Sequence, residues 1–196
     1  MLSKAERTRQ FILEKAAPLF NEKGVSGVSI DDVLAATKLT KGCLYGHFES
    51  KEDLSTHVVD LLLVKAREQL LIAIGQGKTA KAKIFAYLDF YKDPLNTQVR
   101  GGCPIFNIAV ESDDLYPEIK EKIAELLRNG QEEFAAIVKH GVDQGEFSNK
   151  IDPALIAFKF VAAIEGAVVM CRVMNTTKPM QALIKSLKSE IDSFVL

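Results

Sequence analysis

A short stretch near the N-terminus, residues 29–54, constrains the fold more than any other part of the chain. It holds three signals for the start of a helix, namely Ser29 with Asp32, Thr40, and Ser50 with Asp53. A hydroxyl at such a position accepts a bond from a backbone amide of the first turn, and an acid three residues later bonds back. The spacing leaves room for two short helices, which are too short to be stable alone. We therefore predict a helix-turn-helix that packs against a neighbouring helix and is followed by a long helix.

The rest of the chain also has helical periodicity. Ile12, Ala16, Leu19 and Phe20 form an apolar stripe at helical spacing, and Gly24 is expected to end that first helix as its C-cap residue. Beyond the opening stretch we expect the long fourth helix to reach about residue 75. The later helices are expected at about 79–92, from Pro104, at 117–144, at 153–174, and from Pro179 onward.

These patterns predict an all-α protein of about nine helices, because no alternation typical of strands is present. We expect an N-terminal helix-turn-helix domain of three helices at residues 1–49. A second helical domain is expected at residues 50–196. The length of 196 residues and the hydrophobic fraction of 47% are sufficient for real cores in both.

The composition indicates a soluble protein. No segment reaches the roughly 18 consecutive apolar residues of a membrane span, since charged residues interrupt even residues 151–173. The first residues lack a signal-peptide core, and three widely spaced cysteines suggest no disulfide framework, so we expect a cytoplasmic location without membrane association. The net charge is -1, yet residues 1–51 hold eight Lys or Arg against six acids. Any phosphate-facing surface is therefore expected near the N-terminus.

The second helix of the helix-turn-helix carries the side chains expected to meet DNA. Lys41, Tyr45 and His47 lie on it, and Lys51 follows directly. The exposed amides and the dipole at its start favour a phosphate oxygen there. Taken one by one, the lysines could be solvated surface charges, Tyr45 a packing residue and His47 a helix cap. Together on one helix-turn-helix they favour an interface with double-stranded DNA.

Residues 7–54 closely resemble the DNA-binding domain of the TetR family of transcriptional regulators. The resemblance rests on Lys23-Gly24, Ser29, Val33-Leu34-Ala35-Ala36, Leu39-Thr40-Lys41-Gly42, Leu44-Tyr45, His47-Phe48 and Ser50-Lys51-Glu52-Asp53-Leu54. It implies DNA-backbone contacts, or positions beside them, for Ser29, Thr40, Lys41, Tyr45, His47 and Lys51. Such contacts set the position of a protein on DNA rather than its sequence preference.

The base-facing side of the recognition helix is expected to be sparse. With Leu44 and Phe48 turned inward, helical geometry places Gly42 and Gly46 toward the groove. Two glycines in so short a helix cost about 1 kcal/mol each relative to alanine. We predict that direct base contacts are few and come from Thr40, Lys41 and Cys43, while DNA shape and half-site spacing supply the rest of the specificity.

The family resemblance implies that the last five helices bind an effector and form a homodimer through the last two. The eighth helix contains the small residues Ala157, Ala162, Ala163, Gly166 and Ala167, which allow close helix approach. The candidate effector-contacting residues are Tyr87, Tyr91, Cys103, Phe106, Asn107, Glu111, Phe134, Phe158 and Glu165. Ordinary core packing is the alternative for each aromatic residue among them.

Two of these candidates have further interpretations. Glu165 interrupts an apolar run, so it is expected to pair with Arg172, to cross the dimer interface, or to meet a cationic or hydrogen-bonding ligand. Gly101-Gly102-Cys103-Pro104 with Asn107 and Glu111 resembles a pattern in one branch of the family, some of whose members sense electrophiles through a cysteine. A thiol at a helix N-terminus can be activated, although a buried packing cysteine is the alternative.

The expected function is that of a transcriptional repressor released from a palindromic operator by a small-molecule effector. The alternative is a thiol-based sensor of electrophiles or redox state that acts through Cys103. An enzyme or carrier on a helical scaffold is disfavoured, because His47, His57 and His140 have no metal-ligand spacing and no nucleophile or phosphate-loop motif occurs. A helical scaffold that binds only protein is the other rival. We expect no cofactor and no metal.

Overall fold

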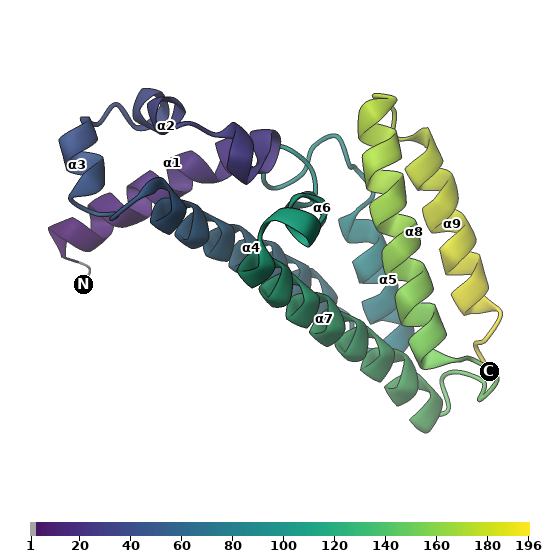
Figure 1. The fold of residues 1–196 in the computed structure, drawn as a ribbon. Helices are drawn as coiled ribbons and strands as arrows, with labels where there is room; N and C mark the ends of the chain where they lie inside the picture. Colours follow the sequence, from purple (N-terminus) through teal and green to yellow (C-terminus); the bar gives the residue numbers. More distant parts are fainter. Residues whose placement is uncertain (1–2) are drawn as a thin grey trace. The chain divides into compact units, whose positions relative to one another are not determined.

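The computed structural model describes residues 3–196, which form nine α-helices (Figure 1). Their bounds are α1 Lys4–Gly27, α2 Ile30–Thr37, α3 Lys41–Tyr45, α4 Lys51–Gly75, α5 Ala80–Phe90, α6 Pro104–Leu115, α7 Pro117–Asp143, α8 Pro153–Val173 and α9 Lys178–Asp192. Over the described residues the only β-type pairing is one isolated bridge, between Phe147 and Val195. The predicted all-α class is therefore confirmed. The expected helix starts at Pro104, Pro117 and Pro153 agree with the structure, whereas α9 begins one residue before Pro179.

The first helix corrects one expectation. Gly24 was expected to end it, yet the helix resumes beyond this residue and continues to Gly27. Gly24 has φ 78° and ψ 169°, so it forms a kink inside α1. This left-handed φ suits glycine, because a Cβ atom there would be strained. The chain thus leaves the helix for one residue and turns before entering α2.

Close contacts divide the chain into two units, each with its own core. Unit 1 contains Met1–Ala66 and Gln98–Lys120, and unit 2 contains Arg67–Thr97 and Glu121–Leu196. The helices α4 and α7 each contribute residues to both units. The domain boundary at residues 49 and 50 stays a prediction.

Unit 1 is organised around α1, which packs against α2 and α6. Its buried face continues the apolar stripe expected from the sequence, with Ile12, Ala16 and Phe20 almost fully buried. Leu44 of α3 and Leu54 of α4 are also buried. The two short helices are therefore held by tertiary packing, which is the usual source of stability for helices of this length.

The core of unit 2 is formed by α5, α8, α9 and the part of α7 that belongs to this unit. Its largest fully buried side chains include Phe147, Phe160, Leu88, Ile164 and Met180. Cys171 is fully buried in the same cluster, as expected for a packing cysteine. Glu146 accepts bonds from the amides of Ala80 and Lys81 at 2.8 and 2.9 Å and so caps the start of α5.

The helix α8 is apolar on two sides. One side joins the core of unit 2, whereas Leu155, Phe158, Val169, Met170 and Val173 are more than half exposed. Among the described helices α8 alone is long and apolar enough to cross a membrane, judged by length and composition. Because a core helix of a soluble protein passes the same test, this finding is weak evidence for a membrane span.

Candidate nucleic-acid interface

The start of α2 is fixed by a closed set of hydrogen bonds. The Ser29 hydroxyl accepts from the Asp32 amide at 3.1 Å, and the Asp32 carboxylate accepts from the Ser29 amide at 2.9 Å, as the capping box predicts. Lys23 of α1 donates to the same carboxylate at 2.6 Å. Together the Lys23 ammonium, the Ser29 hydroxyl and the Ser29 amide hold the pKa of Asp32 well below its usual range.

This arrangement predicts an acid-sensitive α2. Because the pKa of Asp32 is lower in the folded than in the unfolded chain, its ionised carboxylate adds to the free energy of unfolding at pH values above the ordinary carboxyl range. This added stability is lost as the pH falls through the acid range. We expect Asp32→Asn to lower the thermal unfolding midpoint more at pH 7 than at pH 3. Circular dichroism melts at both pH values test this, with Asp31→Asn on the neighbouring exposed residue as the control. Equal lowering at the two pH values would contradict the assignment.

The turn between α2 and α3 is tight and sets the direction of α3. Lys38 adopts the left-handed conformation, with φ 60° and ψ 23°, and its amide bonds to the Leu34 carbonyl at 2.9 Å. Thr40 then caps α3 by accepting from the Cys43 amide at 3.2 Å. The hydroxyl proton of Thr40 remains available to donate outward. The turn thus presents the N-terminus of α3 with its cap in place.

The predicted DNA-contacting side chains lie on the outer side of α3 and just beyond it. Lys41 and Tyr45 are exposed, and the Lys41 Nζ lies 6.0 Å from the centre of the Tyr45 ring. Cys43 and His47 are half-buried. Lys51 is also half-buried, and its Nζ is 3.5 Å from the Ser26 carbonyl oxygen. Unit 1 therefore presents these side chains along α3, just beyond its end and at the start of α4.

Ser29 differs from the other predicted contacts because its hydroxyl is already engaged. It accepts from the Asp32 amide and also donates to the Asp32 carboxylate at 2.7 Å. A DNA contact through Ser29 would have to share this cap. The DNA-contacting role of each of these residues stays a prediction.

Of the two glycines, Gly42 lies inside the recognition helix as expected, whereas Gly46 does not. The helix α3 ends at Tyr45, so only Gly42 lies inside it, while Gly46 is its C-cap residue and bonds to the Gly42 carbonyl at 3.0 Å. Both are exposed. A Cβ atom on Gly42 would meet nothing within 4 Å, whereas one on Gly46 would lie 3.3 Å from the Cys43 carbonyl oxygen. The cost of a glycine inside the helix therefore applies to Gly42 alone.

Phe48 anchors the recognition helix to the rest of unit 1. Its ring is buried, with the Arg9 guanidinium 4.9 Å above it and the His57 ring centre at 6.0 Å. Asp53 caps the next segment by accepting from the Glu49 amide at 3.0 Å. Asp53 also lies 3.0 Å from the His57 Nδ1. Residues of α1 and α4 thus fix the end of α3 from two sides.

The kink of α1 is closed by a carboxylate from α6. The Glu111 side chain accepts from the Val25 amide at 2.6 Å and from the Ser26 amide at 2.7 Å. The kink at Gly24 interrupts the helical pattern that would otherwise satisfy these amides. A Cβ atom on Gly24 would lie 2.7 Å from the Glu111 carboxylate. The absence of a side chain at Gly24 therefore permits this contact.

A second joint between α1 and α6 involves two asparagines. The Asn107 Nδ2 lies 2.9 to 3.1 Å from three oxygens, namely the Asn21 carbonyl, the Asn21 side chain and the Gly101 carbonyl. The buried Asn21 side chain donates to the Arg100 carbonyl at 2.8 Å. Gly101 has φ 114°, and a Cβ atom there would lie 2.6 Å from the Asn21 carbonyl oxygen. Asn107 and Glu111 are thus engaged with α1, and their predicted effector contacts stay predictions.

We predict that Glu111→Gln destabilises unit 1. A glutamine offers one acceptor oxygen, and its NH₂ group would face a backbone amide that also donates. The expected loss is on the order of 2 kcal/mol in the free energy of unfolding, because a backbone donor loses its partner. Urea unfolding followed by circular dichroism measures it, and Asp113→Asn on the exposed side of α6 is the matched control. Equal stability of the two variants would contradict the assignment.

The other candidate effector residues are divided between the two units. Cys103 and Phe106 are half-buried in unit 1, and Cys103 is the N-cap residue of α6. In unit 2, the Tyr87 ring lies 5.3 Å from Tyr91 and 4.9 Å from Phe134. Unit 2 therefore brings together an aromatic cluster, and its role in effector binding stays a prediction.

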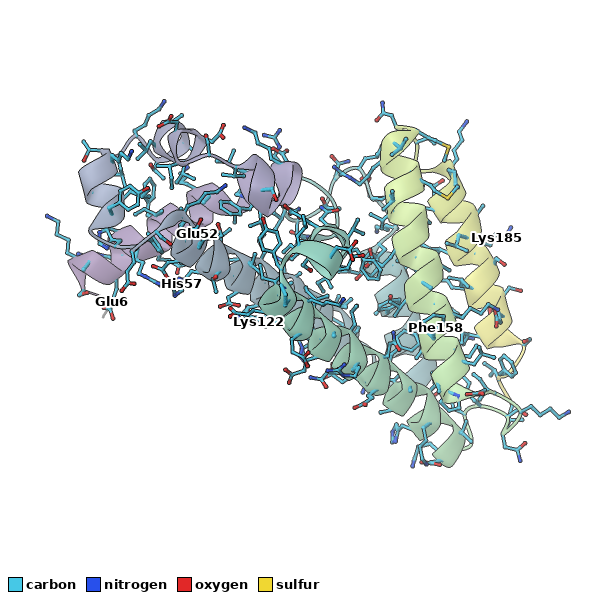
Figure 2. The ribbon with its side chains drawn as sticks, viewed as in Figure 1. Glu6, Glu52, His57, Lys122, Phe158 and Lys185 are labelled. Atoms are coloured by element: carbon cyan, nitrogen blue, oxygen red, sulfur yellow. The ribbon has the colours of Figure 1, made fainter. Side chains whose placement is uncertain are left out.

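On α8, the apolar Phe158 is exposed whereas the acidic Glu165 is buried. Phe158 was expected to line a pocket, but its side chain is 59% exposed on the outer face of α8 (Figure 2). Phe160, two positions later and therefore on nearly the opposite face of the helix, is buried in the core instead. Glu165 is buried within the core of unit 2, with 4% exposure. Arg172 donates to the Pro94 carbonyl at 3.4 Å. The three alternatives for Glu165 stay predictions.

Sequence reasoning missed Asn21, Ser26 and Tyr116. The Ser26 hydroxyl lies 2.8 Å from the Tyr116 hydroxyl, which links the end of α1 to the segment between α6 and α7. Asn21 follows Leu13 and Ala17 at four-residue steps, so the periodicity of α1 already placed a polar side chain on its buried face. No sequence signal marked Ser26 or Tyr116. Over residues 3–196 no group of three or more metal-ligating side chains is placed to hold an ion.

Comparisons with known proteins agree with this geometry. Residues 12–58 match the family of bacterial regulatory proteins called tetR, and residues 80–187 match the tetracyclin repressor-like C-terminal domain. The chain is 23% identical to the transcriptional repressor DhaR of Mycobacterium sp. (strain GP1), covering 88% of this chain and 86% of that protein.

Two solved structures cover nearly the whole chain. A TetR regulator from Chloroflexus aurantiacus has a TM-score of 0.93 and 34% identity, covering 99% of this chain and 98% of its own. A TetR-family regulator from Cytophaga hutchinsonii has a TM-score of 0.88 and 32% identity, covering 100% of this chain and 98% of its own. The similarity therefore extends over both units.

Proposed function

The chain belongs to the TetR family of transcriptional regulators, and we propose that it is a repressor that leaves a palindromic operator when a small-molecule effector binds. As a member of this family it is a DNA-binding protein and not an enzyme. The observation that carries the proposal is the set of exposed or half-buried donors around α3, held in place by the buried Leu44 and Phe48. We place its activity in the cytoplasm, where DNA is accessible.

The proposed contacts with DNA follow from the positions of the donors. Lys41 and Lys51 neutralise phosphates, Tyr45 and His47 donate to phosphate oxygens, and the amides at the start of α3 add a further donor set. Few side chains remain for the bases, since Gly42 faces open space. We therefore propose sparse direct readout through Thr40, Lys41 and Cys43.

A homodimer is supported by the exposed side of α8. We define the α8 stripe as Leu155, Phe158, Ala162, Gly166, Val169 and Val173, which recur at steps of three or four residues and are all exposed. Ala157 and Ala167, by contrast, are buried in the core of unit 2. The small residues in the middle of the stripe permit close approach of a second copy. A twofold dimer would place two recognition helices on successive major-groove turns, about 34 Å apart.

Effector release is proposed to act through α4. This helix begins directly after the helix-turn-helix and continues unbroken from Lys51 to Gly75, with residues in both units. An effector that contacts the aromatic cluster of Tyr87, Tyr91 and Phe134 would favour a different position of α4. The separation of the two recognition helices would then no longer match the groove spacing.

Selection of bound fragments from genomic DNA tests this proposal. We expect enrichment of palindromic sites whose half-sites lie about one helical turn apart, with affinity that falls as salt rises. Metabolites related to the neighbouring genes would then be screened for release of the selected fragment. Binding without any site preference, or without salt dependence, would contradict the proposal.

Thiol sensing through Cys103 is the second candidate. Cys103 stands at the N-cap position of the 12-residue helix α6, with Gly101 and Gly102 before it. A thiol at such a position is favourably placed to react as a thiolate. In a Cys43→Ser background, which removes the free thiol of the DNA-facing side, we expect alkylation by N-ethylmaleimide to release DNA, and we expect no release once Cys103→Ser is added. An unchanged response of Cys103→Ser would contradict thiol sensing and leave effector release untouched.

A further inference from the structure

Unit 1 contains a cavity whose lining includes none of the predicted effector residues. It has a volume of about 430 Å³ and is lined by Val25, Lys51, Glu52, Ser55, Thr56, Leu115, Tyr116, Pro117, Glu118 and Ile119. The lining therefore comes from the end of α1, the first turns of α4, and the segment where α6 ends and α7 begins. Its size falls in the range typical of small-molecule sites.

One side of the cavity is apolar. Val25 and Ile119 are buried, Leu115 and Pro117 are exposed at the edge, and the Tyr116 ring lies between them in the sequence. Such a surface gains free energy by covering the hydrocarbon part of a ligand. The cavity thus suits a molecule with an apolar or aromatic body.

Each donor group of the lining has at least one partner, although the Lys51 ammonium keeps further protons. The Lys51 ammonium lies 3.5 Å from the Ser26 carbonyl oxygen, and the Tyr116 hydroxyl lies 2.8 Å from the Ser26 hydroxyl. Ser55 donates its proton to the Lys51 carbonyl at 2.7 Å. Thr56 donates its proton to the Glu52 carbonyl at 3.1 Å. The two small hydroxyls can therefore offer the cavity only their acceptor lone pairs.

Two carboxylates complete the polar side. Glu52 stands in the first turn of α4, and Glu118 in the first turn of α7 (Figure 2 labels Glu52). In the described part of the chain Glu118 makes no ion pair and no side-chain hydrogen bond, and it is exposed at the edge of the cavity. With one ammonium against two carboxylates, the titratable groups of the lining sum to a negative charge. This net negative charge and the acceptor oxygens of the lining favour a ligand that donates and is positively charged.

We propose that this cavity binds a small amphipathic organic cation, namely a protonated amine attached to an apolar or aromatic body. The ammonium group donates to the Glu118 carboxylate and to the hydroxyl oxygens of Ser55 and Thr56. The body of the ligand covers Leu115, Pro117 and Ile119. The site depends only on the geometry of unit 1, and it shares one lining residue, Lys51, with the proposed DNA contacts.

The test uses the full-length protein with ¹³C-labelled isoleucine methyl groups. The probes are 2-phenylethylammonium, the neutral 2-phenylethanol and the anionic 3-phenylpropionate, which are similar in size. We expect the ammonium probe to shift the Ile119 methyl signal, with an affinity at least about fivefold higher than that of either other probe. The variant Ile119→Val identifies the signal. Equal affinity for the alcohol or the anion, or an unmoved Ile119 signal, overturns the proposal.

A pair of matched variants tests the role of the carboxylate. Glu118→Gln keeps the size of an exposed side chain and removes its charge, and it is expected to weaken binding of the ammonium probe about three- to tenfold. Glu125→Gln makes the same change on α7 outside the lining and is expected to leave binding unchanged. Because both side chains are exposed, neither variant threatens the fold. Equal effects of the two variants overturn the proposal.

Discussion

Replacing Lys41 with alanine is expected to weaken binding to a selected DNA fragment by about ten- to a hundredfold. In the proposed dimer the substitution removes one phosphate contact from each protomer, at the start of each recognition helix. Each lost contact also lowers the steepness of the salt dependence, by about 0.9 per phosphate in a plot of log affinity against log salt. The slope should therefore fall by about two. Fluorescence anisotropy titrations at several KCl concentrations give both quantities.

The control is Lys185→Ala, which removes an exposed lysine from α9 in unit 2 (Figure 2). It makes the same change in net charge and is expected to leave the slope unchanged. Lys41→Ala should also keep the helical content and melting temperature, since Lys41 is exposed and its nearest described partner is the Tyr45 ring at 6.0 Å. If the two variants have the same slope, Lys41 is an ordinary solvated charge.

Local signals were sufficient for the parts of the fold that depend on neighbouring residues. The capping box of Ser29 and Asp32, the Thr40 cap and the proline starts of α6, α7 and α8 all predicted helix boundaries that the structure confirms. In each case a side chain satisfies, or a proline lacks, a backbone donor within its own first turn. Such interactions are encoded within a few residues, so they can be recognised in a single sequence.

Contacts between distant segments could not be predicted in the same way. Gly24 carries the sequence signature of a helix end, and only the Glu111 carboxylate, 87 positions later, explains why α1 kinks there and continues. Likewise α8 is apolar around most of its circumference. Periodicity alone therefore could not decide that Phe160 faces the core and Phe158 faces outward. These features depend on which helix packs against which.

The outward face of α8 is expected to form the interface of the proposed dimer. We expect the double variant Phe158→Asp with Val169→Asp to convert the proposed dimer into a monomer at micromolar concentration. Both side chains are more than half exposed in the single chain, so the substitutions leave the core of unit 2 intact. In a dimer they would bury four carboxylates without partners, and each uncompensated charge costs several kcal/mol. Sedimentation equilibrium measures the change.

Loss of the dimer should also reduce DNA affinity on the order of a hundredfold or more, because a monomer contacts only one half-site. The control is Val110→Asp, which places one carboxylate per chain, half the charge of the double variant, on an exposed apolar position of α6 in unit 1, outside the α8 stripe. It is expected to remain dimeric. A double variant that stays dimeric would show that the second copy packs on another surface, and the exposed α8 stripe would then need a different partner.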